Sequence, residues 1–110
     1  MRLFNYVLDL SKLGFKEGEG KEVNHKVTFE RYLETGLSAL YSQGLDNKTR
    51  REYARILDKL DLSSDGTIKL EESEFDIINE VFSSEKAKFD PKQTRIVTLY
   101  IKALEGAQKL

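Results

Sequence analysis

The twelve residues from Asp61 to Glu72 constrain this chain more than any other segment. Gly66 stands at the sixth position, where it permits a sharp turn that a side chain would resist. Around this turn, oxygen atoms recur at positions that can surround one hard cation such as calcium. Four are side-chain oxygens and one is a backbone carbonyl, and the residues are Asp61, Ser63, Asp65, Thr67 and Glu72. The segment therefore predicts one calcium site between two helices.

This ligand set is incomplete. Lys69, at the ninth position, cannot ligate a cation, and Ser63 supplies a hydroxyl where a carboxylate would bind more strongly. Only three carboxylates then face the ion, which predicts weak to moderate binding with a dissociation constant of roughly 10⁻⁵ to 10⁻³ M. An Asp-Gly turn before a glutamate-rich helix start also forms without any metal, so a metal-free turn is the alternative.

The loop resembles the calcium-binding loop of the EF-hand family, and Leu57 and Leu60 stand where that family places apolar residues. The resemblance implies a second hand, because two loops of this family pair through the residues at their eighth positions. Residues 16–27 look like the longer first loop of two-hand calcium sensors, which makes Val27 the expected partner of Ile68. This first loop lacks an ordered set of acids and is assigned no metal. A plain connector is the alternative.

Composition favours a single helical domain. The chain has 110 residues, of which 34% are charged and one is proline, and this length suffices for one modest core. It has no cysteine and a single histidine, His25, which excludes disulfides, thiolate metal sites and a cysteine nucleophile. We therefore expect a protein that is not an enzyme and that works in an intracellular, reducing compartment.

Charge is distributed unevenly, although the net charge is -1. Seven acids and two lysines between Asp58 and Asp76 give this segment a charge of -5, so a bound cation would relieve repulsion there. A basic patch precedes it without interleaved aromatic residues, which predicts a solvated helix face and no nucleic-acid interface; its residues are Lys48, Arg50, Arg51, Arg55 and Lys59. Neither a secretory signal nor a membrane-spanning run is predicted.

Apolar periodicity predicts five helices. Residues 1–13 carry both a helical and an alternating pattern, and we expect a helix, with a strand as the alternative. Thr28, Thr49 and Asp90-Pro91 signal the starts of three further helices, and another follows the ion loop over residues 71–82. The predicted fold is all-α: an EF-hand-like pair of helix-loop-helix units plus an additional C-terminal helix. Within one domain, 1–110, the parts are a degenerate hand (1–42), an EF-hand-like unit (49–83) and the extra helix (90–107).

Two functions are consistent with these features. In the first, the chain is a calcium-binding protein-interaction module in which Ca²⁺ orders the 61–72 loop and modulates an apolar groove. In the second, it is a metal-independent adaptor, inhibitor or assembly protein, encoded by a virus or mobile element, with a vestigial hand. Both predict a protein partner. The apolar stripe of the 90–107 helix is expected either to close the groove or to form a homo-oligomer interface.

Overall fold

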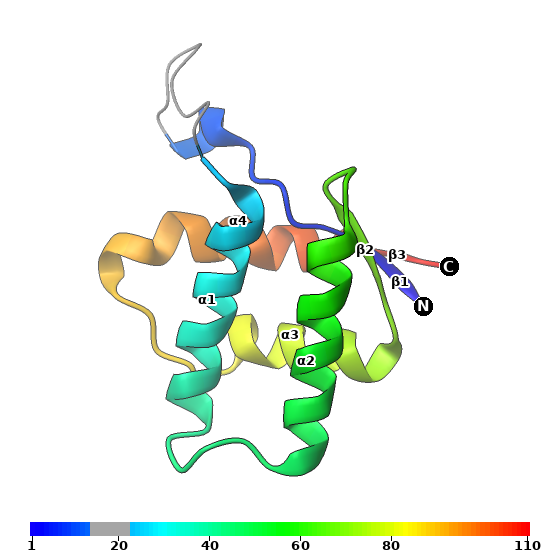
Figure 1. The fold of residues 1–110 in the computed structure, drawn as a ribbon. Coiled ribbons are helices and arrows are strands. Elements are labelled where there is room, and N and C mark those ends of the chain that lie inside the picture. The colour runs from blue at the N-terminus through cyan, green and yellow to red at the C-terminus, as the bar shows by residue number, and fades with distance from the viewer. Residues whose placement is uncertain (14–22) are drawn as a thin grey trace.

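The structure, a computed structural model, describes residues 1–13 and 23–110. Its helices stand beside a small antiparallel sheet (Figure 1). The helices are α1 (His25–Leu40), α2 (Asn47–Leu62), α3 (Glu72–Ser83), α4 (Thr94–Glu105) and the short 3-10 helices η1 (Leu10–Leu13) and η2 (Pro91–Gln93). The strands are β1 (Arg2–Asn5), β2 (Thr67–Leu70) and β3 (Gln108–Lys109), in the order β2-β1-β3. Within the described ranges, no helix is long and apolar enough to cross a membrane.

The chain is mostly helical as predicted, but the all-α prediction is wrong because a three-stranded sheet is present, and the predicted helix over residues 1–13 is wrong as well. This segment begins with β1, and every second side chain from Phe4 through Tyr6 to Leu8 is buried, whereas Asn5 and Val7 are exposed. A helix would have placed Phe4 and Leu8 on one side but turned Tyr6 to the opposite side. The alternating pattern prevails because β1 lies between β2 and β3, where its backbone finds hydrogen-bonding partners on both edges.

Strand β1 also lies where the sequence predicts the first helix of a degenerate hand. Ile68 lies opposite Phe4 in the sheet, and Val27 lies in the first turn of α1 with its side chain 45% exposed. The predicted pairing of Val27 with Ile68 is therefore wrong. The unit predicted over residues 1–42 lacks its first α-helix, and residues 14–22 of its loop lie outside the described residues. A paired-hand arrangement is not confirmed.

Polar caps decide where the helices begin. The side chains of Asn24 and Asp46 accept hydrogen bonds from backbone N–H groups three residues further on, at 3.1 and 2.8 Å. Helices α1 and α2 therefore begin before the caps predicted at Thr28 and Thr49, because asparagine and aspartate upstream provide equally good or better caps. The predicted start at Asp90-Pro91 is confirmed, since Asp90 forms a capping box there.

Phe29 of α1 packs between strand β1 of the sheet and helices α3 and α4. Its ring centre lies 5.2 Å from that of Phe4 in β1, 5.4 Å from that of Tyr100 in α4 and 6.3 Å from that of Phe82 in α3. Aromatic rings at these separations attract one another beyond the area they bury. Tyr100 and Leu104 of α4 are buried in this cluster, so the apolar stripe predicted for residues 90–107 packs within its own chain.

Gly36, in the interior of α1, tests the packing between α1 and α3. A Cβ atom at this position would collide with Val81 Cγ1 and lie 3.3 Å from the Val81 carbonyl oxygen. Alanine gains about 1 kcal/mol of helix propensity over glycine, but overpacking costs about 1–3 kcal/mol. We therefore expect Gly36→Ala to lower the free energy of unfolding in urea. Ser38→Ala, on the exposed side of the same helix, should not lower it, and the same result for both variants would contradict the tight contact.

Candidate functional site

Hydrogen bonds within the protein close the turn of the predicted ion loop. The hydroxyl of Ser63, at the end of α2, donates to the Thr67 carbonyl at 2.8 Å. A serine hydroxyl has only one proton to donate, so the Tyr6 hydroxyl, 2.9 Å away, is the donor to Ser63 Oγ. Because Tyr6 is only 3% exposed, this relay ties the turn to the segment that follows β1.

Asp65 and Gly66 shape the other half of the turn. One carboxylate oxygen of Asp65 accepts hydrogen bonds from the N–H (3.0 Å) and the hydroxyl (2.9 Å) of Thr67, and these bonds lower the pKa of Asp65. Gly66 has a φ of +84°, a conformation that favours glycine. Its carbonyl accepts from the N–H of Tyr6 at 3.1 Å. The turn is where the sequence predicts it, but its polar groups satisfy one another.

The two ends of the predicted loop have other partners. Asp61 lies exposed in the last turn of α2, where its backbone carbonyl accepts from Lys26 Nζ at 3.3 Å. Glu72 begins α3 and accepts from Arg2 Nε at 3.3 Å. The guanidinium carbon of Arg2 lies 4.4 Å from the centre of the Phe75 ring, within cation–π range. Strand β1 therefore holds the glutamate that is predicted to close the ion shell.

The three predicted carboxylate ligands, Asp61, Asp65 and Glu72, are not grouped as a metal site in this arrangement. Among the described residues, no three His, Cys, Asp or Glu side chains are grouped so that they could hold a metal ion. Two predicted ligand atoms, Ser63 Oγ and Thr67 O, do meet, but they bond to each other. One oxygen of Glu72 bonds to Arg2 and one oxygen of Asp65 bonds to Thr67, so an ion would share these carboxylates with their protein partners. Calcium binding stays a prediction from the sequence.

Glu74 belongs to the acid-rich segment, yet it has a structural role. It is 1% exposed, and its Oε1 accepts hydrogen bonds from Lys59 Nζ (2.5 Å) and from the N–H of Glu71 (2.8 Å). Glu71 and Glu74 form the capping box of α3. The three-residue spacing of Glu71 and Glu74 predicts the capping box from the sequence alone. The ion pair with Lys59 forms only because α2 packs against α3. The carboxylate of Glu74 therefore stabilises the fold.

One face of the sheet is open. Phe4 and Ile68 point into the core, so their neighbours along the strands point away from the helices. Leu62, at the end of α2, is 86% exposed and lines a hollow of about 300 Å³ together with residues of this outward face. We call the following residues the open sheet face: Met1, Leu3, Leu62, Lys69 and Gln108.

The free edge of β2, by contrast, is partly blocked. Because Tyr6 and Gly66 are hydrogen-bonded in the ladder, Thr67 turns its backbone groups away from β1. The N–H and the carbonyl of Thr67 are already hydrogen-bonded, to Asp65 and Ser63 respectively. Lys69 places a charge on the same strand, which also discourages the addition of another strand. The outward face of the sheet is therefore more accessible than the edge of β2.

Replacing Ser63 by alanine tests whether the turn is held by the protein alone. The change removes two hydrogen bonds and leaves the Thr67 carbonyl and the Tyr6 hydroxyl without their partner. We expect the free energy of unfolding, measured in urea with a chelator present, to fall by about 1–3 kcal/mol. Ser64→Ala is the matched control, since Ser64 is exposed in the same turn, and it should change this value by less than about 0.5 kcal/mol. Equal effects of the two variants would contradict the assignment.

The lowered pKa of Asp65 predicts an acid-sensitive contribution to stability. A carboxyl whose folded pKa lies below its unfolded value of about 3.9 stabilises the fold above that value. The contribution is lost as the pH falls through the folded pKa. Hydrogen bonds from Thr67 give Asp65 this behaviour. As the pH falls from about 5 to about 2, we expect the melting temperature of Asp65→Asn to fall less than that of the wild type. Identical pH profiles would disprove the role of Asp65.

No protein-family model matches the chain, and comparisons with curated proteins and with solved structures likewise return no match. The likeness to the EF-hand family therefore rests on the 61–72 loop alone, and the function has to be argued from the residues of this chain.

Proposed function

We propose that the chain is a metal-independent protein-binding module that receives a basic, apolar-containing segment of its partner on the open sheet face. The observation that carries the proposal is the exposure of Leu62, 86%, beside the hollow that it lines with Met1 and Lys69. Removing a leucine side chain from water contributes about 1.5–3 kcal/mol. A partner that covers this position therefore gains a substantial part of its affinity there.

Other apolar side chains surround Leu62. Met1 is 44% exposed and lines the same hollow. Leu110 is 60% exposed and lies next to Met1, because its N–H donates to the Met1 carbonyl at 2.7 Å. Leu3, half-buried, is flanked by Lys69 and Gln108 of the neighbouring strands. Apolar side chains gathered on one exposed face are a mark of a protein-interaction surface.

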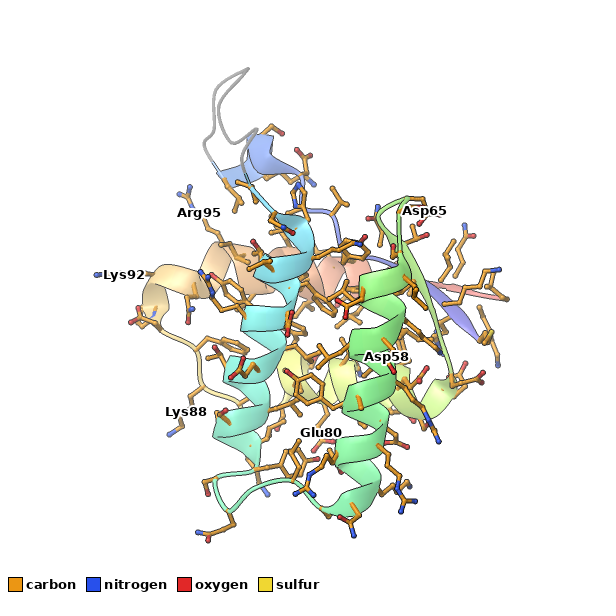
Figure 2. The ribbon with its side chains drawn as sticks, viewed as in Figure 1. Asp58, Asp65, Glu80, Lys88, Lys92 and Arg95 are labelled. Carbon is orange, nitrogen blue, oxygen red and sulfur yellow. The ribbon has the colours of Figure 1, made fainter. Side chains whose placement is uncertain are left out.

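The charge around this face favours a basic partner. The segment from Asp58 to Asp76 carries -5, and Figure 2 shows Asp58 and Asp65 on the side of the molecule that bears the sheet. The charge of Lys59 is balanced by Glu74, with which it forms an ion pair. Acidic groups around an apolar centre steer a positively charged partner toward it and select against an acidic one.

Independence from metal is supported by the hydrogen bonds of the turn. Ser63, Asp65 and Thr67 bond to one another, and Glu72 bonds to Arg2. With these partners in place, hydrogen bonds within the protein close the turn without an ion. The acidic side chains that remain exposed are then available to set the charge of the binding surface.

Calcium binding by the 61–72 loop is the second candidate function. It is favoured by the left-handed backbone of Gly66 and by the approach of Ser63 Oγ to the Thr67 carbonyl, since these are the sixth, third and seventh loop positions. A single Ca²⁺ would be held by Asp61, Ser63, Asp65, Thr67 and Glu72 and would modulate the binding of a protein partner.

A designed amphipathic peptide of leucine and lysine tests the open sheet face, and a peptide of the same composition without an apolar side is its control. We expect Leu62→Ser to weaken the binding of the amphipathic peptide about tenfold. Val27→Ser, the same kind of change at an exposed position of α1, should leave the affinity within about twofold. NMR shifts on binding should include Leu3 and Lys69. Unchanged affinity in Leu62→Ser, or shifts that avoid the sheet, would refute the proposal.

Calorimetric titration of metal-stripped protein with calcium, with magnesium as competitor, separates the two candidates. The metal-independent module predicts no saturable heat and equal peptide affinity with and without calcium. Saturable binding at one site that is lost in Asp61→Ala and kept in Asp58→Ala would favour the calcium candidate. Both aspartates are exposed on α2, but only Asp61 belongs to the loop.

A further inference from the structure

A surface formed by η1 and α4 gathers positive charge from parts of the chain that are far apart in sequence. Lys12 of η1 lies beside the side of α4 that carries Arg95 and Lys102. Together with Thr94, Thr98 and Leu99 these residues line a hollow of about 230 Å³. We call it the cationic hollow. Its described lining contains three cations and no acid.

Helical spacing explains how α4 presents these charges. Arg95 and Lys102 are seven residues apart, so they lie on the same side of the helix. Seven residues of helix span about 10.5 Å, which places the two cations toward opposite ends of the hollow. Lys12, Arg95 and Lys102 are all exposed, so their charged groups are accessible to a ligand in solution.

The three charges have no ion-pair partner within the part of the chain that the structure describes. The ion pairs found there are Arg2–Glu72 and Lys59–Glu74. Asp9, which precedes η1, accepts hydrogen bonds from the N–H and the hydroxyl of Ser11 at 3.1 and 2.6 Å, and its charge also attracts Lys12, although the two form no ion pair. Three like charges around one hollow repel one another, and an anion bound between them would remove this repulsion.

Positive charge continues beyond the hollow. Figure 2 shows Lys88 and Lys92 on the same side of the molecule as Arg95, away from Asp58 and Asp65. Residues 86–105 contain five basic residues and two acids, a charge of +3. The acids are Glu105, at the end of α4, and Asp90, whose carboxylate accepts a hydrogen bond from the N–H of Lys92 at the start of η2. The cations on this side extend beyond the hollow, which favours a ligand larger than one small anion.

We propose that η1, η2 and α4 form a docking surface for the phosphate backbone of a nucleic acid, with Lys12, Arg95 and Lys102 as its central contacts. Lysine and arginine contacts to phosphates position a nucleic acid without reading its sequence. No aromatic side chain belongs to the described lining of the cationic hollow, so the hollow offers no platform for base stacking. The binding is therefore independent of sequence and decreases with salt.

An acidic protein fits this surface less well. Protein interfaces have an apolar centre, and Leu99, half-buried, is the one large apolar residue in the described lining of the hollow. Thr94 and Thr98 donate their hydroxyl protons to the carbonyls of Pro91 (2.7 Å) and Thr94 (2.8 Å). Only the cations are then left as donors to a ligand, which suits a chain of phosphates.

Fluorescence anisotropy with labelled single-stranded and double-stranded oligonucleotides of one sequence tests this proposal without involving the open sheet face. The variant carries Lys12→Gln, Arg95→Gln and Lys102→Gln together. The matched control carries Lys48→Gln, Arg51→Gln and Arg55→Gln, which remove the same charge from exposed positions of α2. In the first variant we expect the affinity to fall at least tenfold and the slope of log K against log salt to decrease by about 2–3. The control should stay within about threefold of the wild type.

Three results would overturn the proposal. They are equal losses in the two triple variants, no binding of either oligonucleotide by the wild type, and displacement of the oligonucleotide by polyglutamate as readily as by unlabelled nucleic acid. The last result would assign the surface to an acidic protein. Circular dichroism checks that the variants fold. If the triple variant does not fold, Arg95→Gln and Lys102→Gln are measured singly against Arg51→Gln by the same criterion.

Discussion

The contact between Phe4 and Phe29 is the interaction on which the rest of the structure depends. Phe4 is fully buried, lies opposite Ile68 in the sheet and places its ring centre 5.2 Å from that of Phe29. Phe29 in turn contacts rings of α3 and α4. Without this contact β1 would lose the buried side chain that stabilises it in the sheet. Strands β2 and β3 both pair with β1, so the sheet would not form without it. A short sheet of this kind is stable only when packed against helices.

The same strand also organises the candidate loop. Arg2, Phe4 and Tyr6 point to one side because strand residues alternate. Arg2 holds Glu72, Phe4 lies opposite Ile68, and Tyr6 bonds to Ser63 and Gly66. Residues 2–6 thus contact the middle and the Glu72 end of the 61–72 segment, whereas Asp61 accepts a hydrogen bond from Lys26 of α1. In this structure the strand provides the cross-links that an ion would provide in a calcium-binding loop.

Acidic and basic side chains lie on different sides of the molecule. Asp58 and Asp65 lie on the side of the molecule that bears the sheet, and Lys88, Lys92 and Arg95 lie on another side (Figure 2). The small net charge of -1 therefore conceals two regions of opposite sign. A protein segment and a nucleic acid would approach different sides of the molecule, so the two proposed partners need not compete. This arrangement suits an assembly or adaptor protein.

The sequence by itself determined the helical character, the helix over residues 71–82, the start at Asp90-Pro91 and the glycine turn at Gly66, because each depends on neighbours a few residues apart. Caps are equally local, yet Asn24 and Asp46 prevailed over Thr28 and Thr49 since they are the stronger residues and lie upstream. Only the tertiary structure decided that residues 2–5 form a strand, that Glu72 bonds to Arg2 and that Lys12 and Arg95 line the same hollow. Each of these contacts joins residues far apart along the chain, and their energies depend on the packing of elements whose positions no local pattern encodes.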